Sequence, residues 1–317
     1  MECGPARPRR RIPAGCEIHD PIPLGGRREP SRVAQNAPVD APLAWPATLA
    51  ELGEPLALGR TAEVFALGDA EVVKVLRPGF PDRIGELEAR VASVVATAGV
   101  AAPRFLGMAR IEGRVALAYE RLSGSSMLDR MSRRPWQIDG LARQMAGLHT
   151  AMHATDGNGL PDQRDGLRVM IERAGTTLPQ DARLAALGRL DSLAAGGSTC
   201  HGDMHPGNIL LTHHGPVVID WLTGSCGSPA CDVARTLFLM RHSGVPAYIR
   251  QPQRGLIALA RRRFCTVYLE QYARVSPFDG HEVAAWRLPV LAARLGEGIE
   301  TERTALLQLI RDELELA

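Results

Sequence analysis

The hydrophobic pattern of this chain changes character once, near residue 120, and this change constrains the fold more than any other feature. Before it, the short apolar and β-branched runs PLALG, AEVFALG and EVVKVL are separated by Gly59 and Gly68, a pattern typical of strands joined by turns. The stretch PDRIGELEARVASVVATAG then has apolar residues at helical spacing between Asp82 and Gly99, and the runs RFLGMAR and RVALAYE follow it. We therefore expect three strands, one helix and two more strands.

Beyond YERLSG the spacing of the apolar residues becomes helical. One short β interlude interrupts this part of the chain, in NILLTHHGPVVIDW. The expected fold class is α+β, with a small antiparallel β lobe carrying one helix at residues 48–120 and a larger, mainly helical lobe at residues 121–317. The cleft between two such lobes is the expected place of a ligand site. The amphipathic stretches are WQIDGLARQMAGLHTAMHA and the segments near 166–174, 180–195, 254–274, 281–298 and 299–316.

Residues 1–47 differ from the rest of the chain in composition. They hold 9 of the 23 prolines and show neither a period of 2 nor one of 3.6. Such a segment buries too little apolar surface to offset the entropy of ordering. We expect a disordered leader and assign it no function.

Charge and cysteine usage narrow the class of function. The formal net charge of +2 comes from 37 basic and 35 acidic residues that are interspersed, whereas a nucleic-acid-binding domain gathers a basic face. No run of about 18 apolar residues is present to span a membrane, and the six cysteines show no Cys-x-x-Cys spacing. We predict a cytoplasmic protein with free thiols and without a nucleic-acid, membrane or obligate protein partner.

The most informative stretch is CHGDMHPGNILLTHHGPVVIDW, residues 200–221. His201, Asp203 and Asn208 stand at the relative positions of a phosphotransferase catalytic loop. In such a loop an aspartate accepts the proton of the substrate hydroxyl, and an asparagine five residues later holds Mg²⁺. Asp220 ends the strand-like VVID, where a carboxylate is a suitable ligand for Mg²⁺ on nucleotide phosphates. The stretch predicts phosphoryl transfer.

Lys74 is the only lysine in the chain, and the other 36 basic residues are arginines. It lies on the strand-like EVVKVL, and Glu88 lies on the following helix. This layout suits an ammonium group that serves nucleotide phosphates and an orienting carboxylate from one position, because an ammonium is a point charge and a guanidinium is a wide planar fork. We hypothesise that geometry preserved Lys74 while other basic positions drifted to arginine. The alternative is chance retention on a surface strand.

The ordered set HGDMHPGN, VVIDW and DVARTLFLMR resembles the aminoglycoside phosphotransferase and choline kinase-like family, relatives of protein kinases that phosphorylate small molecules. LGRTAEVFALG, VVKVLRPGF, ELEARVASVVATAGVAAPRFLG and LARQMAGLHTAMHA also match, so the resemblance runs from about residue 54 to the end of the chain. It implies a two-lobed, protein-kinase-like fold. It also implies an enzyme that uses ATP or GTP and Mg²⁺ to phosphorylate a small hydroxylated substrate.

The resemblance implies roles for the matching polar residues of the cleft. Asp203 corresponds to the catalytic base, and Asn208 and Asp220 correspond to the Mg²⁺ ligands. Lys74 and Glu88 correspond to the pair that anchors the nucleotide phosphates.

Other matching positions concern the nucleotide and the loop beneath it. Tyr119–Leu122, with Glu120 and Leu122, corresponds to the hinge whose backbone meets the base, and Asp232 corresponds to a buried helix acid that orders the catalytic loop. The phosphate loop GRTAEVF departs from the Gly-x-Gly-x-x-Gly of protein kinases. We expect Gly59 and Thr61 of this loop to contact the phosphate oxygens of the nucleotide, through backbone amides and the Thr61 hydroxyl.

The acceptor is expected to be small. Only eleven residues separate Asp220 from Asp232, too few for a segment that docks a peptide. In the family the terminal helices shape the acceptor site, which makes Trp221, Trp286, Arg294 and Glu297 the candidates. Residues 251–317 hold nine acids and nine arginines, a balance that gives no support to a polycationic aminoglycoside as the acceptor.

Two other readings of the same residues are open. His201, Asp203 and His205 would project from one face of a strand as in a metal-dependent hydrolase, although Pro206 and Gly207 favour a loop. A catalytically silent nucleotide-binding regulator of the same fold is the other alternative.

His149 and His153 lie four residues apart on one helix. That spacing can hold zinc, but no glutamate or third ligand accompanies them in the sequence. We expect a helix packed beneath the catalytic loop.

Overall fold

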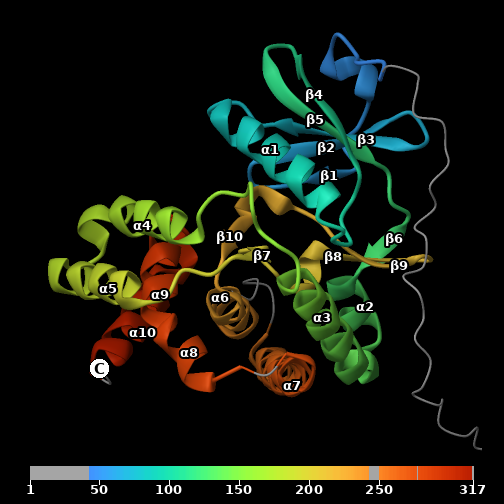
Figure 1. The fold of residues 1–317 in the computed structure, drawn as a ribbon. Coiled ribbons are helices and arrows are strands. Elements are labelled where there is room, and N and C mark those ends of the chain that lie inside the picture. The colour runs from blue at the N-terminus through green and yellow to red at the C-terminus, as the bar shows by residue number, and fades with distance from the viewer. Residues whose placement is uncertain (1–42, 243–249, 277, 316–317) are drawn as a thin grey trace, which may run out of the picture. The chain divides into compact units, whose positions relative to one another are not determined.

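The computed structural model describes residues 43–242, 250–276 and 278–315. The predicted disordered leader falls almost wholly outside these residues. The expected switch from strands to helices is confirmed, and the fold is α+β. Figure 1 shows the first five strands and α1, coloured blue to green, in the upper part of the view, with the helices α2–α10 below them.

The first five strands form one antiparallel sheet in the order β1-β2-β3-β5-β4. Each runs where an apolar or β-branched stretch predicts it, and one helix, α1, separates β3 from β4 as expected. A bulge between Phe105 and Gly107 interrupts the pairing of β4 with β5. The elements are β1 (Ala57–Leu58), β2 (Ala62–Leu67), β3 (Glu71–Leu76), α1 (Arg83–Thr97), β4 (Phe105–Ile111) and β5 (Arg114–Glu120).

The alternation of side chains between the two faces of the sheet determines on which face Lys74 of β3 lies. Val73 and Val75 are buried in a cluster on one face of the sheet. Leu76, on the other face, packs with Ile84 of α1. Because side chains of a strand alternate between faces, Lys74 shares the face of Leu76 and is directed toward α1.

Helix α1 is held at close range on two sides. An added Cβ at Gly85 would lie 2.5 Å from Val115 of β5, and one at Gly224 would lie 2.6 Å from Val91, so a larger residue at either position would force its neighbours to shift. The buried stripe of α1 includes Glu88, Val91 and Val95, at helical spacing. Val91 and Val95 belong to the core cluster of the helical lobe, and this packing joins the sheet to that lobe.

Trp45 packs against the cluster formed by Phe65, Val73 and Ile111 on the outer face of the sheet. The 3₁₀ helix η1 (Leu49–Leu52) contributes Leu49 and Leu52 to the same cover. The prediction had placed residues 43–47 in the leader. Trp45 instead belongs with the β lobe, because one aromatic side chain can bury surface that the proline-rich composition around it does not reveal.

The rest of the described chain is mainly helical. Two small antiparallel sheets support the segment between α5 and α6, with strand orders β10-β7 and β6-β8-β9. Helix α3 packs along α7, and α9 packs against α4, α5, α6 and α10. The elements are β6 (Gly124–Ser126), α2 (Met127–Arg133), α3 (Ile138–His153), α4 (Gln163–Arg173), α5 (Gln180–Ser192), β7 (Ser198–Cys200), β8 (Ile209–Thr212), β9 (Gly215–Val218), β10 (Ser225–Gly227), α6 (Pro229–His242), α7 (Gln251–Val275), α8 (Gly280–Ala285), α9 (Arg287–Leu295) and α10 (Arg303–Glu315).

Within the described ranges, no helix combines the length and the apolar character needed to cross a membrane.

Candidate active site

Three side chains from distant parts of the chain meet at Lys74, and we call Lys74, Glu88 and Asp220 the lysine centre. The ammonium Nζ of Lys74 lies 2.7 Å from Oε1 of Glu88 and 2.8 Å from Oδ1 of Asp220. Lys74 and Asp220 are 146 residues apart in sequence. Burial lowers the pKa of Lys74, but the two carboxylates outweigh burial and raise it above its usual value, so Nζ carries its positive charge.

Glu88 has a further partner that the sequence did not reveal. The hydroxyl of Tyr119, at the end of β5, donates to Oε1 of Glu88 at 3.2 Å. Burial raises the pKa of Glu88, and Lys74 offsets part of this effect. Oε2 of Glu88 is buried and has no hydrogen-bond partner among the described residues. Tyr119 was predicted to lie at the hinge, and its strand β5 pairs with β3, the strand that carries Lys74. This pairing is what could have indicated a contact near Lys74.

Asp220 has an unusual backbone. Its φ of 64° and ψ of 67° lie in the left-handed region, which aspartate tolerates better than most residues. Residues in such conformations cluster at functional sites. The side chain is 48% exposed, and no hydrogen bond or ion pair within the described chain engages its Oδ2.

The loop from His201 to Asn208 connects β7 to β8 and is anchored by Asp232 of α6. Oδ2 of Asp232 accepts from the backbone N–H of His201 at 2.6 Å, and Oδ1 accepts from that of Gly202 at 2.9 Å. Gly202 has a φ of 74°, and a Cβ there would lie 2.7 Å from the carbonyl oxygen of Thr223. The geometry agrees with the predicted position of Asp232 beneath the loop.

Two histidines complete the contacts of Asp232, and we call Asp232, His149 and His153 the loop anchor. Both donate Nε2–H to Oδ2 of Asp232, at 3.1 and 3.3 Å, while their Nδ1 atoms lie 2.6 and 2.7 Å from the hydroxyls of Tyr268 and Tyr272. The three ligand atoms are close enough to hold a metal ion, but all three side chains are already satisfied by hydrogen bonds. The sequence analysis assigned Asp232 to the loop but did not connect it with the two histidines, from which it is distant in sequence, 79 residues in the case of His153.

Burial and charge act in opposite directions in the loop anchor. Burial alone would raise the pKa of Asp232, but the two histidines hold it well below its usual range. Burial lowers the pKa of His149 to about 4, and the neighbouring His153 acts in the same direction. His149 is therefore neutral at pH 7, which matches a ring that donates from one nitrogen and accepts at the other.

Asp203 and Asn208 face each other across the loop. The amide nitrogen of Asn208 donates to the backbone oxygen of Asp203 at 3.0 Å and to its Oδ2 at 3.2 Å. His205 Nε2 lies 3.7 Å from Oδ2 of Asp203, and Arg235 Nη2 lies 3.8 Å from Oδ1. Burial raises the pKa of Asp203, but His205 and Arg235 outweigh it and hold the pKa well below its usual range. Asp203 is thus a carboxylate at any physiological pH.

The arrangement does not favour a metal-dependent hydrolase. His201 is fully buried, its Nδ1 accepts from the backbone N–H of Asp203, and its Nε2 donates to the carbonyl oxygen of Ile219. Both ring nitrogens are therefore engaged. Among the described residues, His201, Asp203 and His205 do not form a group whose ligand atoms converge.

The predicted nucleotide contacts lie on loops around the sheet. Gly59 and Thr61 lie in the loop between β1 and β2, where the N–H of Gly59 donates to the carbonyl oxygen of Ala62. Glu120 is the last residue of β5 and Leu122 follows the strand, and the side chain of Glu120 accepts from the backbone N–H of Arg104 at 2.9 Å. These hydrogen bonds hold the β1–β2 loop and the end of β5 in place. They do not involve a nucleotide, so the roles of these residues in nucleotide binding stay predictions.

The four candidate acceptor residues are mostly buried. Trp221 donates its indole N–H to the carbonyl oxygen of Val218 and packs edge-on against His201, while Trp286 lies in the core of the helical lobe. Arg294 is buried and pairs with Glu302 and Glu297. Their burial gives no support to an acceptor-lining role for either tryptophan or for Arg294.

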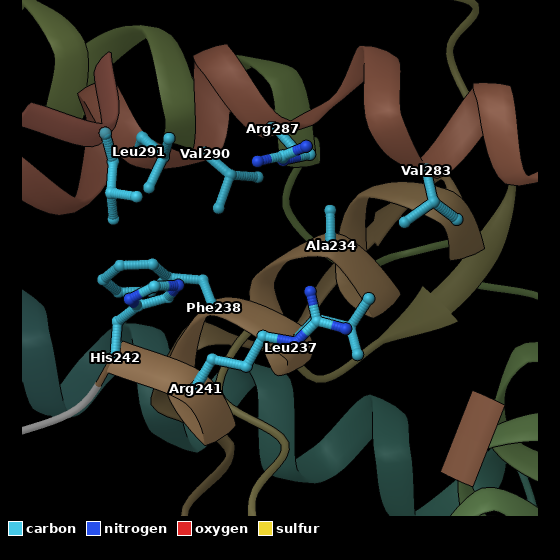
Figure 2. A pocket seen from close by; sticks show the side chains of 10 residues that line it. Ala234, Leu237, Phe238, Arg241, His242, Val283, Arg287, Val290 and Leu291 are labelled. Carbon is cyan, nitrogen blue, oxygen red and sulfur yellow. The ribbon is translucent and has the colours of Figure 1, made fainter. Parts of the chain in front are cut away.

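A surface pocket lies elsewhere, among α6, α8, α9 and α10. Figure 2 shows the rings of Phe238 and His242 side by side on its wall, with Arg241 and Arg287 near apolar residues. None of the residues predicted for the site lines it. The residues predicted to carry phosphoryl transfer therefore lie at the lysine centre and on the loop from His201 to Asn208, and not at this pocket.

The family pattern described as the phosphotransferase enzyme family (APH) matches residues 53–265. This is more than half of the chain, so the protein belongs to that family, and the predicted class, a phosphotransferase with an alcohol group as acceptor, is confirmed. A comparison with curated proteins found no match.

Several solved structures share the fold. A thermostable mutant of the aminoglycoside phosphotransferase APH(4)-Ia, in a ternary complex with AMP-PNP and hygromycin B, has a TM-score of 0.59 and 16% identity, covering 83% of this chain and 92% of that one. The amicoumacin kinase hAmiN, in complex with AMP-PNP, Ca²⁺ and Ami, has a TM-score of 0.54 and 14% identity over 84% and 89% of the two chains. An aminoglycoside-3'-phosphotransferase of type VIII has a TM-score of 0.51 and 22% identity over 75% and 90%.

Proposed function

We propose that this phosphotransferase moves the γ-phosphoryl group of ATP or GTP to a hydroxyl group of a small molecule. The observation that carries the proposal is the position of Lys74 Nζ between Glu88 and Asp220. In kinases a lysine on a strand of the small lobe pairs with a glutamate of the following helix and serves the nucleotide phosphates, while a further aspartate holds the metal. AMP-PNP in two structures of the same fold supports a nucleoside triphosphate as the donor.

Asp220 and Asn208 suit Mg²⁺ by the chemistry of their donors, since carboxylate and amide oxygens are ligands that this ion prefers. Oδ2 of Asp220 is not engaged within the described chain, and its side chain is about half exposed. The amide nitrogen of Asn208 is used by Asp203, which leaves its side-chain oxygen for a cation. When bound, Mg²⁺ would offset the negative charge of the phosphates.

Asp203 is proposed to orient the acceptor. The acceptor oxygen forms a bond to the γ-phosphorus as the bond from that phosphorus to the bridging oxygen breaks, and the nucleoside diphosphate leaves. The hydroxyl proton passes to Asp203. Because the pKa of Asp203 is held well below its usual range, the carboxylate is a weak base, and its main contribution is the position of the hydroxyl.

The class of acceptor follows from size and charge. The segment from Asp220 to Asp232 contains only the 3₁₀ helix η5 (Trp221–Thr223), β10 and the first residues of α6, which leaves no docking segment for a peptide. Glu297, the acidic member of the predicted acceptor residues, is already paired with three arginines. We therefore propose a small hydroxylated acceptor that is not a polycation.

We keep the cytoplasm as the proposed location. The described cysteines, Cys200, Cys226, Cys231 and Cys265, are all free thiols, which suits a reducing compartment.

The test is a screen of hydroxylated metabolites and antibiotics for acceptor-dependent release of ADP or GDP, with the phosphate ester identified by ³¹P NMR. Asp203→Asn keeps the size of the side chain and should lower turnover about a hundredfold or more, while the affinity for Mg·AMP-PNP changes little. Acceptor-dependent release that is no faster in the wild type than in Asp203→Asn would contradict the proposal, and nucleotide binding without release in either protein would favour a catalytically silent regulator.

A further inference from the structure

Arg235 is a charged residue of the site that the sequence analysis did not assign. It lies on α6, one turn after Asp232, and its side chain is only 11% exposed. Its Nη2 lies 2.5 Å from Oε1 of Glu297 and 3.8 Å from Oδ1 of Asp203. A single guanidinium nitrogen thus lies between the carboxylate proposed to orient the acceptor and a carboxylate from the end of α9.

Glu297 connects this arginine to the rest of the lobe. Its Oε1 is engaged by Arg235, and its Oε2 lies 2.6 Å from Nη1 of Arg294. Arg294 is in turn bound by both oxygens of Glu302, at 2.7 and 3.0 Å. Because both oxygens of Glu297 have strong charged partners in a largely buried setting, this residue is better suited to hold other side chains than to bind an acceptor.

Glu297 also reaches the β lobe. Nη2 of Arg60, in the loop between β1 and β2, lies 3.9 Å from Oε2 of Glu297. The side chain of Arg60 is 65% exposed, so this pair is weak and screened by salt. The loop that is expected to contact nucleotide phosphates therefore connects to Asp203 through three successive ion pairs, Arg60 with Glu297, Glu297 with Arg235 and Arg235 with Asp203.

The buried arginine has unused capacity. Nε of Arg235 is buried and has no hydrogen-bond partner among the described residues. Arg235 is thus not held in place by a full set of hydrogen bonds, as a purely structural buried arginine would be. Its place is determined by the two carboxylates on either side of Nη2.

We propose that Arg235 is a positioning residue for Asp203, and that Glu297 and Arg60 connect its position to the phosphate loop. The inference rests on the function proposed above. Arg235 and Asn208 approach the Asp203 carboxylate through its two different oxygens, so that together they fix its rotation.

The first experiment compares Arg235→Met with Arg241→Met. Arg241 lies on the same helix, is exposed, and lines the separate pocket of Figure 2. Turnover is measured as nucleoside diphosphate release, with the acceptor found in the screen or otherwise with water. We expect Arg235→Met to lower turnover about tenfold or more, with less than about a threefold change in Mg·AMP-PNP affinity, while Arg241→Met stays within twofold of the wild type.

The second experiment separates positioning from a structural role. Arg235→Lys keeps the charge and should recover part of the lost turnover, although a buried arginine to lysine exchange costs stability. Thermal unfolding of each variant is recorded alongside. If Arg235→Met does not fold, Arg235→Lys and Glu297→Gln provide the test, because each should lower turnover more than it lowers nucleotide affinity.

The third experiment tests the connection to the phosphate loop. Arg60→Met should lower turnover about threefold, and the variant that combines Arg60→Met with Arg235→Met should be no slower than Arg235→Met within twofold, because both act through Glu297. If the losses in turnover of Arg60→Met and Arg235→Met multiply in the double variant, the proposed connection of Arg60 to Arg235 through Glu297 is wrong. Unchanged turnover in Arg235→Met would overturn its positioning role. A large loss in Asp203→Asn together with either result leaves the proposed function in place, whereas no loss in Asp203→Asn counts against that function itself.

Discussion

The lysine centre and the loop anchor are both built around buried charge, yet they differ in what they leave free. At the lysine centre, Asp220 is 48% exposed and Oε2 of Glu88 has no partner among the described residues. At the loop anchor, the side chain of Asp232 is 0% exposed, and its oxygens accept from two backbone N–H groups and two histidines. One centre has capacity for a ligand, and the other has none.

The number of unused oxygens therefore distinguishes a carboxylate that can bind a ligand from one that only stabilises the fold, within the same site. A buried carboxylate whose every lone pair is used stabilises the fold around it, because removing it leaves several donors unsatisfied. A carboxylate with an unused oxygen beside a cation is available for chemistry. Substitutions in the two centres should therefore separate activity from stability.

The largest expected effect is on activity at the lysine centre. Asp220→Asn removes the charge that pairs with Lys74 and the proposed ligand for Mg²⁺, so turnover should fall about a hundredfold to a thousandfold. Because Asp220 is half exposed, the melting temperature should change little.

The matched control is Asp191→Asn, which removes an exposed carboxylate that pairs with Arg168. It should leave turnover unchanged. A loss of stability in Asp220→Asn comparable to its loss of activity would contradict the distinction between the two centres.

The next effect is on stability at the loop anchor. Asp232→Asn places an amide where the backbone N–H groups of His201 and Gly202 and the Nε2–H of His149 and His153 all donate. The NH₂ group of the new amide would then face at least one of these N–H donors, and the free energy of unfolding should fall by about 3–5 kcal/mol. Urea unfolding followed by circular dichroism measures it, and a loss below about 1 kcal/mol would show that the anchor is dispensable.

A third effect concerns pH. The pKa of His149 is lowered to about 4 in the folded protein, while in the unfolded chain it is about 6.5. Between these values the unfolded chain binds a proton that the folded chain does not, so stability falls as the pH drops from about 6.5 to 4, by up to about 3 kcal/mol. Urea unfolding at several pH values tests this. His149→Gln should reduce the dependence of the free energy of unfolding on pH, whereas His281→Gln, at an exposed position, should not. The same pH dependence in both variants would contradict this explanation.

The smallest effect tests the packing that brings the lysine centre together. An alanine at Gly224 would place its Cβ 2.6 Å from Val91 of α1, one turn beyond Glu88. The packing between this segment and α1 must shift, and we expect a loss of about 1–3 kcal/mol in stability with a several-fold loss in turnover. Gly147→Ala, in α3 with nothing within 4 Å of the added Cβ, should be neutral or stabilising by up to about 1 kcal/mol. Equal behaviour of the two variants would contradict this.

The sequence predicted the elements whose signal is local. The run EVVKVL became β3 and PDRIGELEARVASVVATAG became α1, because alternation and helical spacing are properties of neighbouring residues. Helix α6 was absent from the predicted amphipathic segments, because most of its residues are buried on every side and no polar face marks it. The short strands β6, β7 and β10 carry too few residues to show a period.

The candidate site was predictable where motif residues lie within one loop or at a known spacing. Asp203 and Asn208, predicted to lie on one loop, contact each other there, and Asp232 binds the backbone of that loop, while their roles in catalysis stay predictions. The contact of Tyr119 with Glu88 and the position of Arg235 between two acids depend on how distant segments pack, which no local pattern encodes. For the same reason the burial of Trp221, whose indole N–H donates to the carbonyl oxygen of Val218, was not predicted.

The central claim is that the lone ammonium of Lys74, held between Glu88 and Asp220, anchors the phosphates of the nucleotide. The most direct measurement is nucleoside diphosphate release, together with Mg·AMP-PNP affinity, in Lys74→Arg, which keeps the charge and changes only its shape. We predict that turnover falls at least about tenfold and that the nucleotide binds more weakly, because the guanidinium cannot occupy one point between the two carboxylates. Full turnover with unchanged affinity would contradict the claim and leave the single lysine as an accident of composition.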